Sequence, residues 1–311
     1  MKKALKIILI LAIVAAVGFL GLVAIYFIQK KPVYYTSYEN AGRYTAGSTT
    51  LEAGAVDEID ISWLSGTVRF RKAAGSAVTV SEDGTGLTDR QQVRWWLDGR
   101  TLRIQYWASG YGTDNDPDKT LVLEIPDGIS VSLEGKKGAV ILGDHDLKDL
   151  SLKMKTADIT AGSLTLENDL VLENGGGETD IRGLTARNAR FNTLLGEVRI
   201  GTASVEGSLE MKSGYAQLQV GTVRGGSVKI TGYRGIRLGL GKCESVALDT
   251  NTGDIAITVR NGAGATVDFD TGSGARMNGK RVEYTARTVI GDGSCSVKVD
   301  ADSGDLTVTA E

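Results

Sequence analysis

The chain has 311 residues, enough for one large domain or two modest ones, and it carries 41 glycines but only three prolines. Residues 1–31 hold five of the 35 basic residues and no acidic one, so residues 32–311 carry 30 basic against 38 acidic residues, a charge of about −8 within a total of −3. This balance argues against a nucleic-acid partner, and two cysteines with a single histidine argue against a disulfide-rich domain and exclude a zinc site built on several imidazoles.

Residues 7–28 contain no charged side chain. As a helix they would measure about 33 Å at about 1.5 Å per residue, which matches a hydrocarbon core of about 30 Å. A cleaved signal peptide is the alternative, but its apolar stretch would be shorter and would end in a small-x-small site, which AIYFIQKK does not provide. The pattern therefore favours an uncleaved transmembrane helix.

Lysines flank this predicted span unequally. Three of them and the terminal amine precede it, whereas two follow it, and the more positive flank stays in the cytoplasm. We therefore expect residues 1–6 in the cytoplasm and the bulk of the chain outside it, as a single-pass protein of the cell membrane. The membrane, through residues 7–28, is the first partner that the sequence predicts.

Residues 29–50 are polar and show no apolar period, which indicates a linker. Residues 51–130 then alternate between apolar and polar side chains in several short runs, as half-buried strands do. Asp98–Gly99 lies between two of these runs, and Asp-Gly favours a two-residue hairpin turn. One face of this hairpin would hold Val93, Trp95, Leu97, Leu102, Ile104 and Tyr106. We predict an N-terminal β-sheet region here.

Within residues 131–311 the sequence repeats every 18–20 residues. Each unit has a turn with a small residue and then a strand, whose first inward residue serves as an anchor: Val140, Ile159, Thr179, Val198, Leu218, Ile236, Ile255, Ala275 and Cys295. Two positions after each anchor stands another apolar or small residue, the period of a strand with one buried face. A second apolar strand, such as LVLEN, follows in most units, and no helical segment is evident.

A fixed period near 20 residues is the signature of stacked repeats, and the Leu and Asn spacing of leucine-rich repeats is missing. We therefore predict an all-β fold: a β-solenoid, or single-stranded β-helix, with about 19–20 residues per coil. The region 51–130 would cap its first end. The half-length unit DSGDLTVTAE would close the other, so that neither end exposes an open strand edge.

The recurring [ST]-x-x-G-x-[VIL]-x-[VIL] units, together with the segment LEIPDG and the N-terminal anchor, resemble a known family. It is the bacterial "putative adhesin" β-strand-repeat family, a domain of unknown function that also occurs in a membrane-anchored protein of Gram-positive envelope-stress operons. The likeness covers roughly residues 50–311. It implies a repetitive β fold, a surface location and binding, and it offers no catalytic residues to carry over.

Asp114, Asp116 and Asp118 form an alternating acidic trio, and calcium loops use such spacing because alternate carboxylates can converge on one ion. An EF-type loop would need Gly and Glu where this chain has Lys119 and Ile125. The trio is thus a candidate calcium site, and a polar hairpin loop is the alternative. No cofactor is predicted.

Trp96, Trp107 and Tyr111 are candidate surface aromatics that could stack on sugar rings or bind a partner protein. The alternative is that they pack against the first coil. His145 follows a glycine corner and is expected in an exposed turn. Cys243 and Cys295 stand at different phases of the repeat and almost three coils apart, so we expect two separate buried thiols rather than a disulfide.

Three functional classes remain from the sequence. The first is a membrane-anchored extracytoplasmic binding module, or adhesin, for an unknown cell-surface glycan or envelope protein. The second is a structural or signalling accessory of a cell-envelope stress response. The third is a β-helix enzyme acting on polysaccharides, but the coils are too uniform in length to supply the long loops that wall such active sites, and no catalytic motif is found. We therefore predict a non-catalytic binding module.

Overall fold

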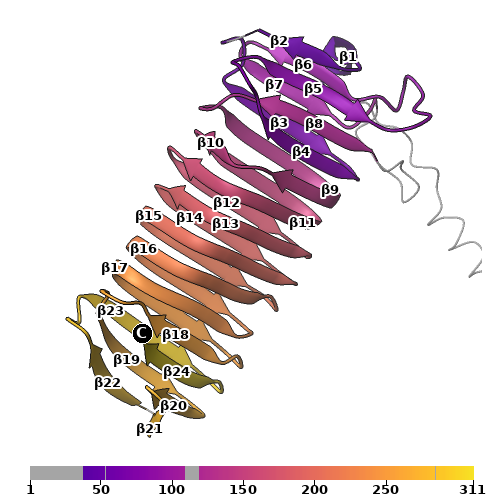
Figure 1. Cartoon of the computed structure of the whole chain (residues 1–311). Helices are drawn as coiled ribbons and strands as arrows, with labels where there is room; N and C mark the ends of the chain where they lie inside the picture. The colour runs from indigo at the N-terminus through magenta and orange to yellow at the C-terminus, as the bar shows by residue number, and fades with distance from the viewer. Residues whose placement is uncertain (1–37, 53, 109–118, 284) are drawn as a thin grey trace, which may run out of the picture.

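The structure is a computed structural model that describes residues 38–52, 54–108, 119–283 and 285–311. It shows an elongated stack of β-strands with the N-terminal segments at one end (Figure 1). In this part of the chain no helix is long and apolar enough to cross a membrane. The predicted span 7–28 lies outside the described residues, as does most of the predicted linker 29–50.

The described residues contain one short 3-10 helix, η1 (Ala41–Arg43), and strands that join into one 24-stranded sheet. The strands are β1 (Thr45–Ala46), β2 (Thr49–Leu51), β3 (Glu58–Trp63), β4 (Thr67–Lys72), β5 (Val78–Asp83), β6 (Arg94–Asp98), β7 (Thr101–Gln105), β8 (Thr120–Ile125), β9 (Ser130–Leu142), β10 (His145–Leu147), β11 (Leu150–Leu166), β12 (Asp169–Asn174), β13 (Glu178–Ala186), β14 (Asn188–Thr193), β15 (Glu197–Ser213), β16 (Gln217–Gly232), β17 (Ile236–Thr250), β18 (Ile255–Val259), β19 (Ala265–Thr271), β20 (Gly274–Met277), β21 (Lys280–Val282), β22 (Thr285–Ile290), β23 (Cys295–Ala301) and β24 (Asp305–Ala310).

Each coil of the central stack adds one segment to each of three parallel ladders. In β15 these segments are 197–200, 202–205 and 208–212, and each pairs with the matching segment of β16. We call them the first, second and third ladders. The first ladder joins the predicted anchors from Val140 to Ile255 one after another. This register confirms the predicted β-solenoid and its period, and adds a short second ladder that the sequence did not reveal.

The ladders enclose a continuous apolar core because inward and outward residues alternate along each segment. In β14, Ala189 and Phe191 are buried, whereas Arg190 and Asn192 are exposed. Burying one such large apolar side chain contributes roughly 1.5–3 kcal/mol, so the stability of the stack comes mainly from contacts between neighbouring coils.

A column of tight turns precedes the first ladder, and two of its glycines show why side chains are excluded there. Gly138 has a φ of 137°, and an added Cβ would lie 1.8 Å from the carbonyl oxygen of Gly66. Gly196 has a φ of 106°, and its Cβ would lie 2.0 Å from the oxygen of Gly177. The repeated glycine in the sequence is therefore a consequence of stacking one turn directly on the next.

At the N-terminal end, β3 and β4 form a coil of the stack itself. β3 pairs in parallel with β9 on one side and β7 on the other, and β4 does the same with β9 and β8. β6 and β5 then close this end with antiparallel pairs to β7 and β8, and β1 and β2 are outermost. The antiparallel strands cover edges that would otherwise remain open.

The predicted hairpin is present as β6 and β7, but its turn is shifted by one residue. Asp98 still belongs to the ladder, so the two-residue loop is Gly99–Arg100, with Gly99 at a φ of 63°. The pair Trp95–Ile104 confirms that these two side chains share a face. The observed loop keeps the glycine at the first central position, where a positive φ is required.

The last unit of the chain does not close the second end, so that prediction is wrong. β23 lies between β17 and β19, and β24 lies between β18 and β20 (Figure 1). The outermost coil is β19–β20, and β22 and β21 cover it with antiparallel pairs. Leu306, rather than Cys295, continues the first ladder after Ile255, and Cys295 pairs with Ala265 in the third ladder. The prediction failed because the antiparallel strands β21 and β22 interrupt the repeat period. In addition, the segment CSVKV alternates between apolar and polar residues in the same way as the strands of the first ladder.

A buried ion pair lies inside the N-terminal end. The ammonium of Lys119 is 2.5 Å from the carboxylate of Glu82, donates to the carbonyl oxygens of Gln91 and Tyr106, and faces the ring of Trp63. The Lys119 side chain is fully buried. Burial lowers the pKa of this ammonium, and the hydrogen bond to Glu82 opposes the shift. The pair is surrounded by the core of the end cap, which indicates a structural role.

Candidate ligand-binding groove

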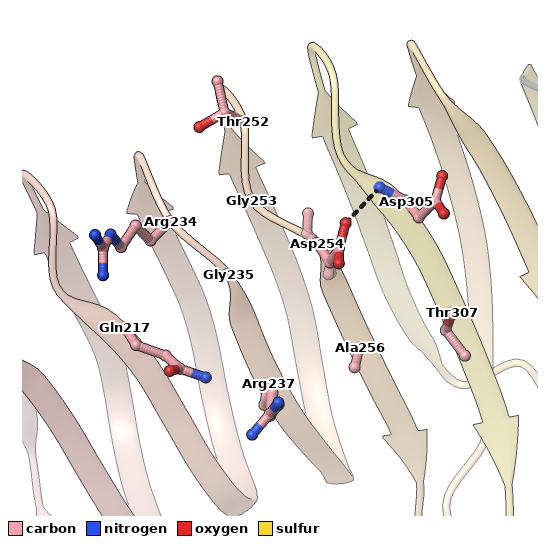
Figure 2. A pocket seen from close by; sticks show the side chains of 11 residues that line it. Gln217, Arg234, Gly235, Arg237, Thr252, Gly253, Asp254, Ala256, Asp305 and Thr307 are labelled. Atoms are coloured by element: carbon pink, nitrogen blue, oxygen red, sulfur yellow. Dashed lines mark hydrogen bonds between the residues drawn. The ribbon is translucent and has the colours of Figure 1, made fainter.

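An open groove lies on the outward face of the first ladder, near the C-terminal end of the stack (Figure 2). It has a volume of about 660 Å³ and extends across β16, β17, β18 and β24. This size falls within the range of about 300–1,000 Å³ in which small-molecule sites are found. The groove depends on the insertion of the last coil, because β24 supplies one of its sides.

The groove is hollow because small residues stand where other coils carry long side chains. The outward residue before each anchor strand is Gln217, Gly235, Asp254 and Asp305 in successive coils, so one glycine interrupts a row of longer groups. In the row of outward residues two positions further along the strands, Ala256 is the small residue, and it pairs with Arg237 of the neighbouring coil. An interruption in two adjacent rows leaves a depression that the neighbouring side chains surround.

Charges of both signs border this depression. Figure 2 shows Arg234 and Arg237 on one side of Asp254, with Asp305 on the other. All four residues are exposed, and among the described residues neither arginine has an ion-pair partner. The two guanidinium groups are therefore available to a ligand, and guanidinium groups can donate several hydrogen bonds in a fixed planar geometry.

Asp254 has a structural contact as well. One of its carboxylate oxygens accepts a hydrogen bond of 3.0 Å from the backbone N–H of Asp305 (Figure 2). Asp158 makes the same contact to Glu178 elsewhere in the stack, at 3.0 Å. Asp254 therefore helps to fix the last coil beside its neighbour while it also lines the groove.

An exposed corner of apolar side chains adjoins the groove. Tyr215 and Tyr233 are 50% and 41% exposed, and their ring centroids are 4.8 Å apart. Leu194 and Leu195 continue this corner on the preceding coil. Tyr233 directly precedes Arg234, so one ring of the aromatic pair and one of the two guanidinium groups lie on consecutive residues. We call the exposed side chains of Leu194, Leu195, Tyr215 and Tyr233 the tyrosine corner.

The tryptophan predictions have different outcomes. Trp107 is only 6% exposed, so its prediction as a surface aromatic is wrong. The chain bends after Gln105, which breaks the alternation, and Trp107 packs edge-on against Tyr106 with centroids 5.2 Å apart. Trp96 is half-buried beside the ring of Tyr44 and the guanidinium of Arg43. Tyr111 lies outside the described residues.

The prediction of an exposed turn at His145 is also wrong. His145 is 1% exposed and pairs with Leu164 in the second ladder, where it points inward. Burial lowers the pKa of its imidazole, and the backbone of Phe70 opposes that shift. An inward histidine at this position is a core residue.

The candidate calcium residues Asp114, Asp116 and Asp118 lie outside the described residues and stay a prediction. Within the described part of the chain, no group of three or more His, Cys, Asp or Glu side chains is placed to hold a metal ion. The lining of the groove instead offers guanidinium, carboxylate, amide and hydroxyl groups. Such a set can bind and orient a polar ligand.

The sequence contained one signal for this groove that pointed to no site by itself. In the column of small turn residues, Arg234 is the exception, with Gly235 displaced by one position. The structure places both at the groove. Gln217, Arg237 and Thr307 gave no signal, because exposed polar residues are ordinary on the outward face of a strand.

The three ladders, the two antiparallel ends and the polar groove define a capped β-solenoid with a ligand-sized hollow on one sheet face. The chain belongs to the family described as "Toastrack DUF4097", a domain of unknown function, whose model matches residues 56–309. No curated protein matches the chain.

Among solved structures, the chain is similar to proteins from several bacteria. One is a "putative adhesin" from Bacteroides fragilis, with 12% identity over 86% of this chain and 97% of that one and a TM-score of 0.36. A "putative adhesin" from Parabacteroides distasonis has 13% identity, the same coverage of both chains and a TM-score of 0.34. A "putative cell adhesion protein" from Clostridium sporogenes has 12% identity over 86% of this chain and 100% of that one, with a TM-score of 0.24.

Proposed function

We propose that this protein is a non-catalytic binding module, anchored in the cell membrane through residues 7–28, that presents its β-solenoid outside the cytoplasm and binds a cell-surface glycan. The observation that carries the binding proposal is the groove on the first ladder, with its two arginines that have no ion-pair partner among the described residues, next to the tyrosine corner.

The chemistry of the groove suits a sugar polymer better than an apolar ligand. Its rim provides donors on Arg234 and Arg237, acceptors on Asp254 and Asp305, and the amide of Gln217. A hydroxyl-rich ligand can use both kinds of group at once. The groove is open to solvent along the sheet face, so a chain can pass across it without threading into the protein.

The tyrosine corner adds the apolar contact that such a ligand needs. Aromatic rings offer a large flat area at low conformational cost, and the two exposed tyrosines lie one coil apart. A polymer that lies across the stack could contact the rings and the groove together. Protein partners can also use such a corner, and the binding experiment separates the two.

The test is binding of the full-length protein, purified in detergent, to isolated cell-surface glycans and separately to detergent extracts of envelope proteins. We expect saturable binding to glycan, measured by calorimetry. Replacement of Arg237 by Ala together with Tyr233→Ser should weaken it by at least about tenfold, or roughly 1.4 kcal/mol. Both side chains are exposed, so the thermal unfolding temperature should hardly change.

Arg187→Ala is the matched control, because Arg187 is an exposed arginine outside the groove. It should bind glycan like the unmodified protein. Equal binding by both variants would reject the groove as the site, and capture of envelope proteins without any glycan binding would replace the proposed ligand class.

A further inference from the structure

The insertion of the last coil brings the two cysteines of the chain together as two free thiols, contrary to the prediction that they lie almost three coils apart. Cys243 in β17 and Cys295 at the start of β23 are 52 residues apart in sequence, yet their Sγ atoms are 3.0 Å apart. That separation is shorter than an ordinary van der Waals contact. The prediction was wrong because it assigned Cys295 to the first ladder, whereas β23 belongs to the third.

The backbone supports a bond between these sulfurs. β17 and β23 are adjacent parallel strands, and the pair Ser245–Ser296 puts Cys295 opposite residue 244, next to Cys243. Adjacent strands lie about 4.8 Å apart, inside the Cα separation of less than about 7 Å that a disulfide requires. Closing the sulfur gap to about 2.05 Å needs a shift of about 1 Å.

The surroundings favour sulfur–sulfur chemistry over metal binding. Neither cysteine belongs to a group of three metal-ligating side chains among the residues that the structure describes. Cys295 is 1% exposed, whereas Cys243 is half-buried and so remains accessible from solvent. Cys243 is therefore the sulfur that can meet an external oxidant, and Cys295, with its Sγ 3.0 Å from that of Cys243, is the sulfur that would act as the internal nucleophile.

We propose that Cys243 and Cys295 are a modification site at which an intramolecular disulfide forms and fastens the inserted coil β23–β24 to β17. The oxidant is a disulfide, either of a small thiol or of a thiol–disulfide oxidoreductase. The Cys243 thiolate attacks it and releases one thiol; the Cys295 thiolate then attacks the sulfur of Cys243 and releases the second. Two protein thiols are oxidised, and one external disulfide is reduced to two thiols.

This bond would act on the groove as well as on the stack. β24 follows β23 directly and supplies Asp305 and Thr307 to the groove. A covalent link at the start of β23 therefore holds one side of the groove in register with β17, which supplies Arg237. The proposal concerns the two thiols alone and does not depend on which ligand the groove binds.

The test exposes the reduced full-length protein, purified in detergent, to glutathione disulfide, then denatures it and alkylates the remaining thiols. We expect both thiols to disappear, a peptide that links Cys243 with Cys295 to be found by mass spectrometry, and the monomer to migrate faster in non-reducing gels. The thermal unfolding temperature should rise on oxidation by on the order of 5–10 °C.

Cys243→Ala and Cys295→Ala are the controls, and each should lose the temperature rise while keeping the circular dichroism of the reduced protein. Two thiols that remain alkylatable after prolonged oxidation would overturn the proposal. So would a bond found only between two chains. If one variant fails to fold, the comparison of oxidised with reduced unmodified protein still decides the matter.

Discussion

His145 occupies an inward position of the second ladder, and the burial of its imidazole lowers its pKa. The charged groups around it act in both directions, since Asp127 and Asp146 favour the protonated ring and Lys72 opposes it. The unfolded chain therefore binds a proton at His145 more readily than the folded chain does. Stability should fall as pH drops below the unfolded pKa of about 6.5.

We expect the free energy of unfolding to decrease between pH 7 and pH 5 by up to about 2 kcal/mol through this one residue. His145 is the only histidine of the chain. The pKa values of the neighbouring Asp144 and Asp146 are lowered, so protonation of those carboxylates changes the free energy of unfolding only below this pH range. Urea unfolding at both pH values measures the effect. In His145→Leu the decrease in the free energy of unfolding should disappear. If the variant keeps the pH dependence of the unmodified protein, the ring of His145 is not buried in solution.

At the level of elements, the sequence predicted the repeating coil well and the ends poorly. The period from Val140 to Ile255 was readable because each coil buries one apolar face against its neighbour, so local alternation and stacking agree. The order of coils at an end depends instead on which strand the chain pairs with after it leaves the regular repeat. At the C-terminal end the chain passes through β21 and β22 and returns to pair β23 with β17 and β19. No local pattern in β23 distinguishes a final coil from an inserted one.

The groove was hard to predict for the same reason. It is formed by Gly235, Arg237 and Ala256 together with Asp305, whose proximity depends on the inserted β24. The displaced turn at Arg234 was the one local irregularity. The contact between Cys243 and Cys295 was missed because a spacing of nearly three coils was converted into distance as though the coils were stacked in chain order.

Because β24 pairs with β18 on one side and β20 on the other, damage to β24 should spread to both. Val308 is fully buried in β24, and Val308→Asp should destabilise the C-terminal coils by more than about 3 kcal/mol, since it buries an unpaired charge. Hydrogen exchange should show lost amide protection in β18 and β20. β13, several coils away, should stay protected, because a coil contacts only its neighbours.

Thr309→Asp is the matched control for that experiment. It adds the same charge to the same strand one residue further on, at a half-buried outward position. Protection in β18 should then be nearly unchanged. Loss of protection throughout the stack in Val308→Asp would mean that the solenoid unfolds as one cooperative unit rather than from its end.

At the level of the whole molecule, the two ends follow one plan. At each end, the coil nearest the chain terminus in sequence is not the outermost coil in space, because another coil lies outside it. Antiparallel strands then cover the edge of that outer coil: β5 and β6 at one end, and β21 and β22 at the other. Covered edges and a net charge of about −8 over residues 32–311 both oppose edge-to-edge association. The stack can therefore remain a separate module at the end of the predicted linker, residues 29–50.

The proposed glycan ligand and the proposed disulfide both require the module to lie outside the cytoplasm, which the predicted span at residues 7–28 would determine. Lys2, Lys3 and Lys6 before the predicted span should keep the N-terminus in the cytoplasm. Protease added to intact spheroplasts that express the full chain should then remove the solenoid from the cells, while a cytoplasmic marker survives. Cleavage only after lysis would place the module inside. Replacing these three lysines with serines leaves Lys30 and Lys31 as the more positive flank and should increase the protected fraction, because the orientation depends on the difference between the flanks.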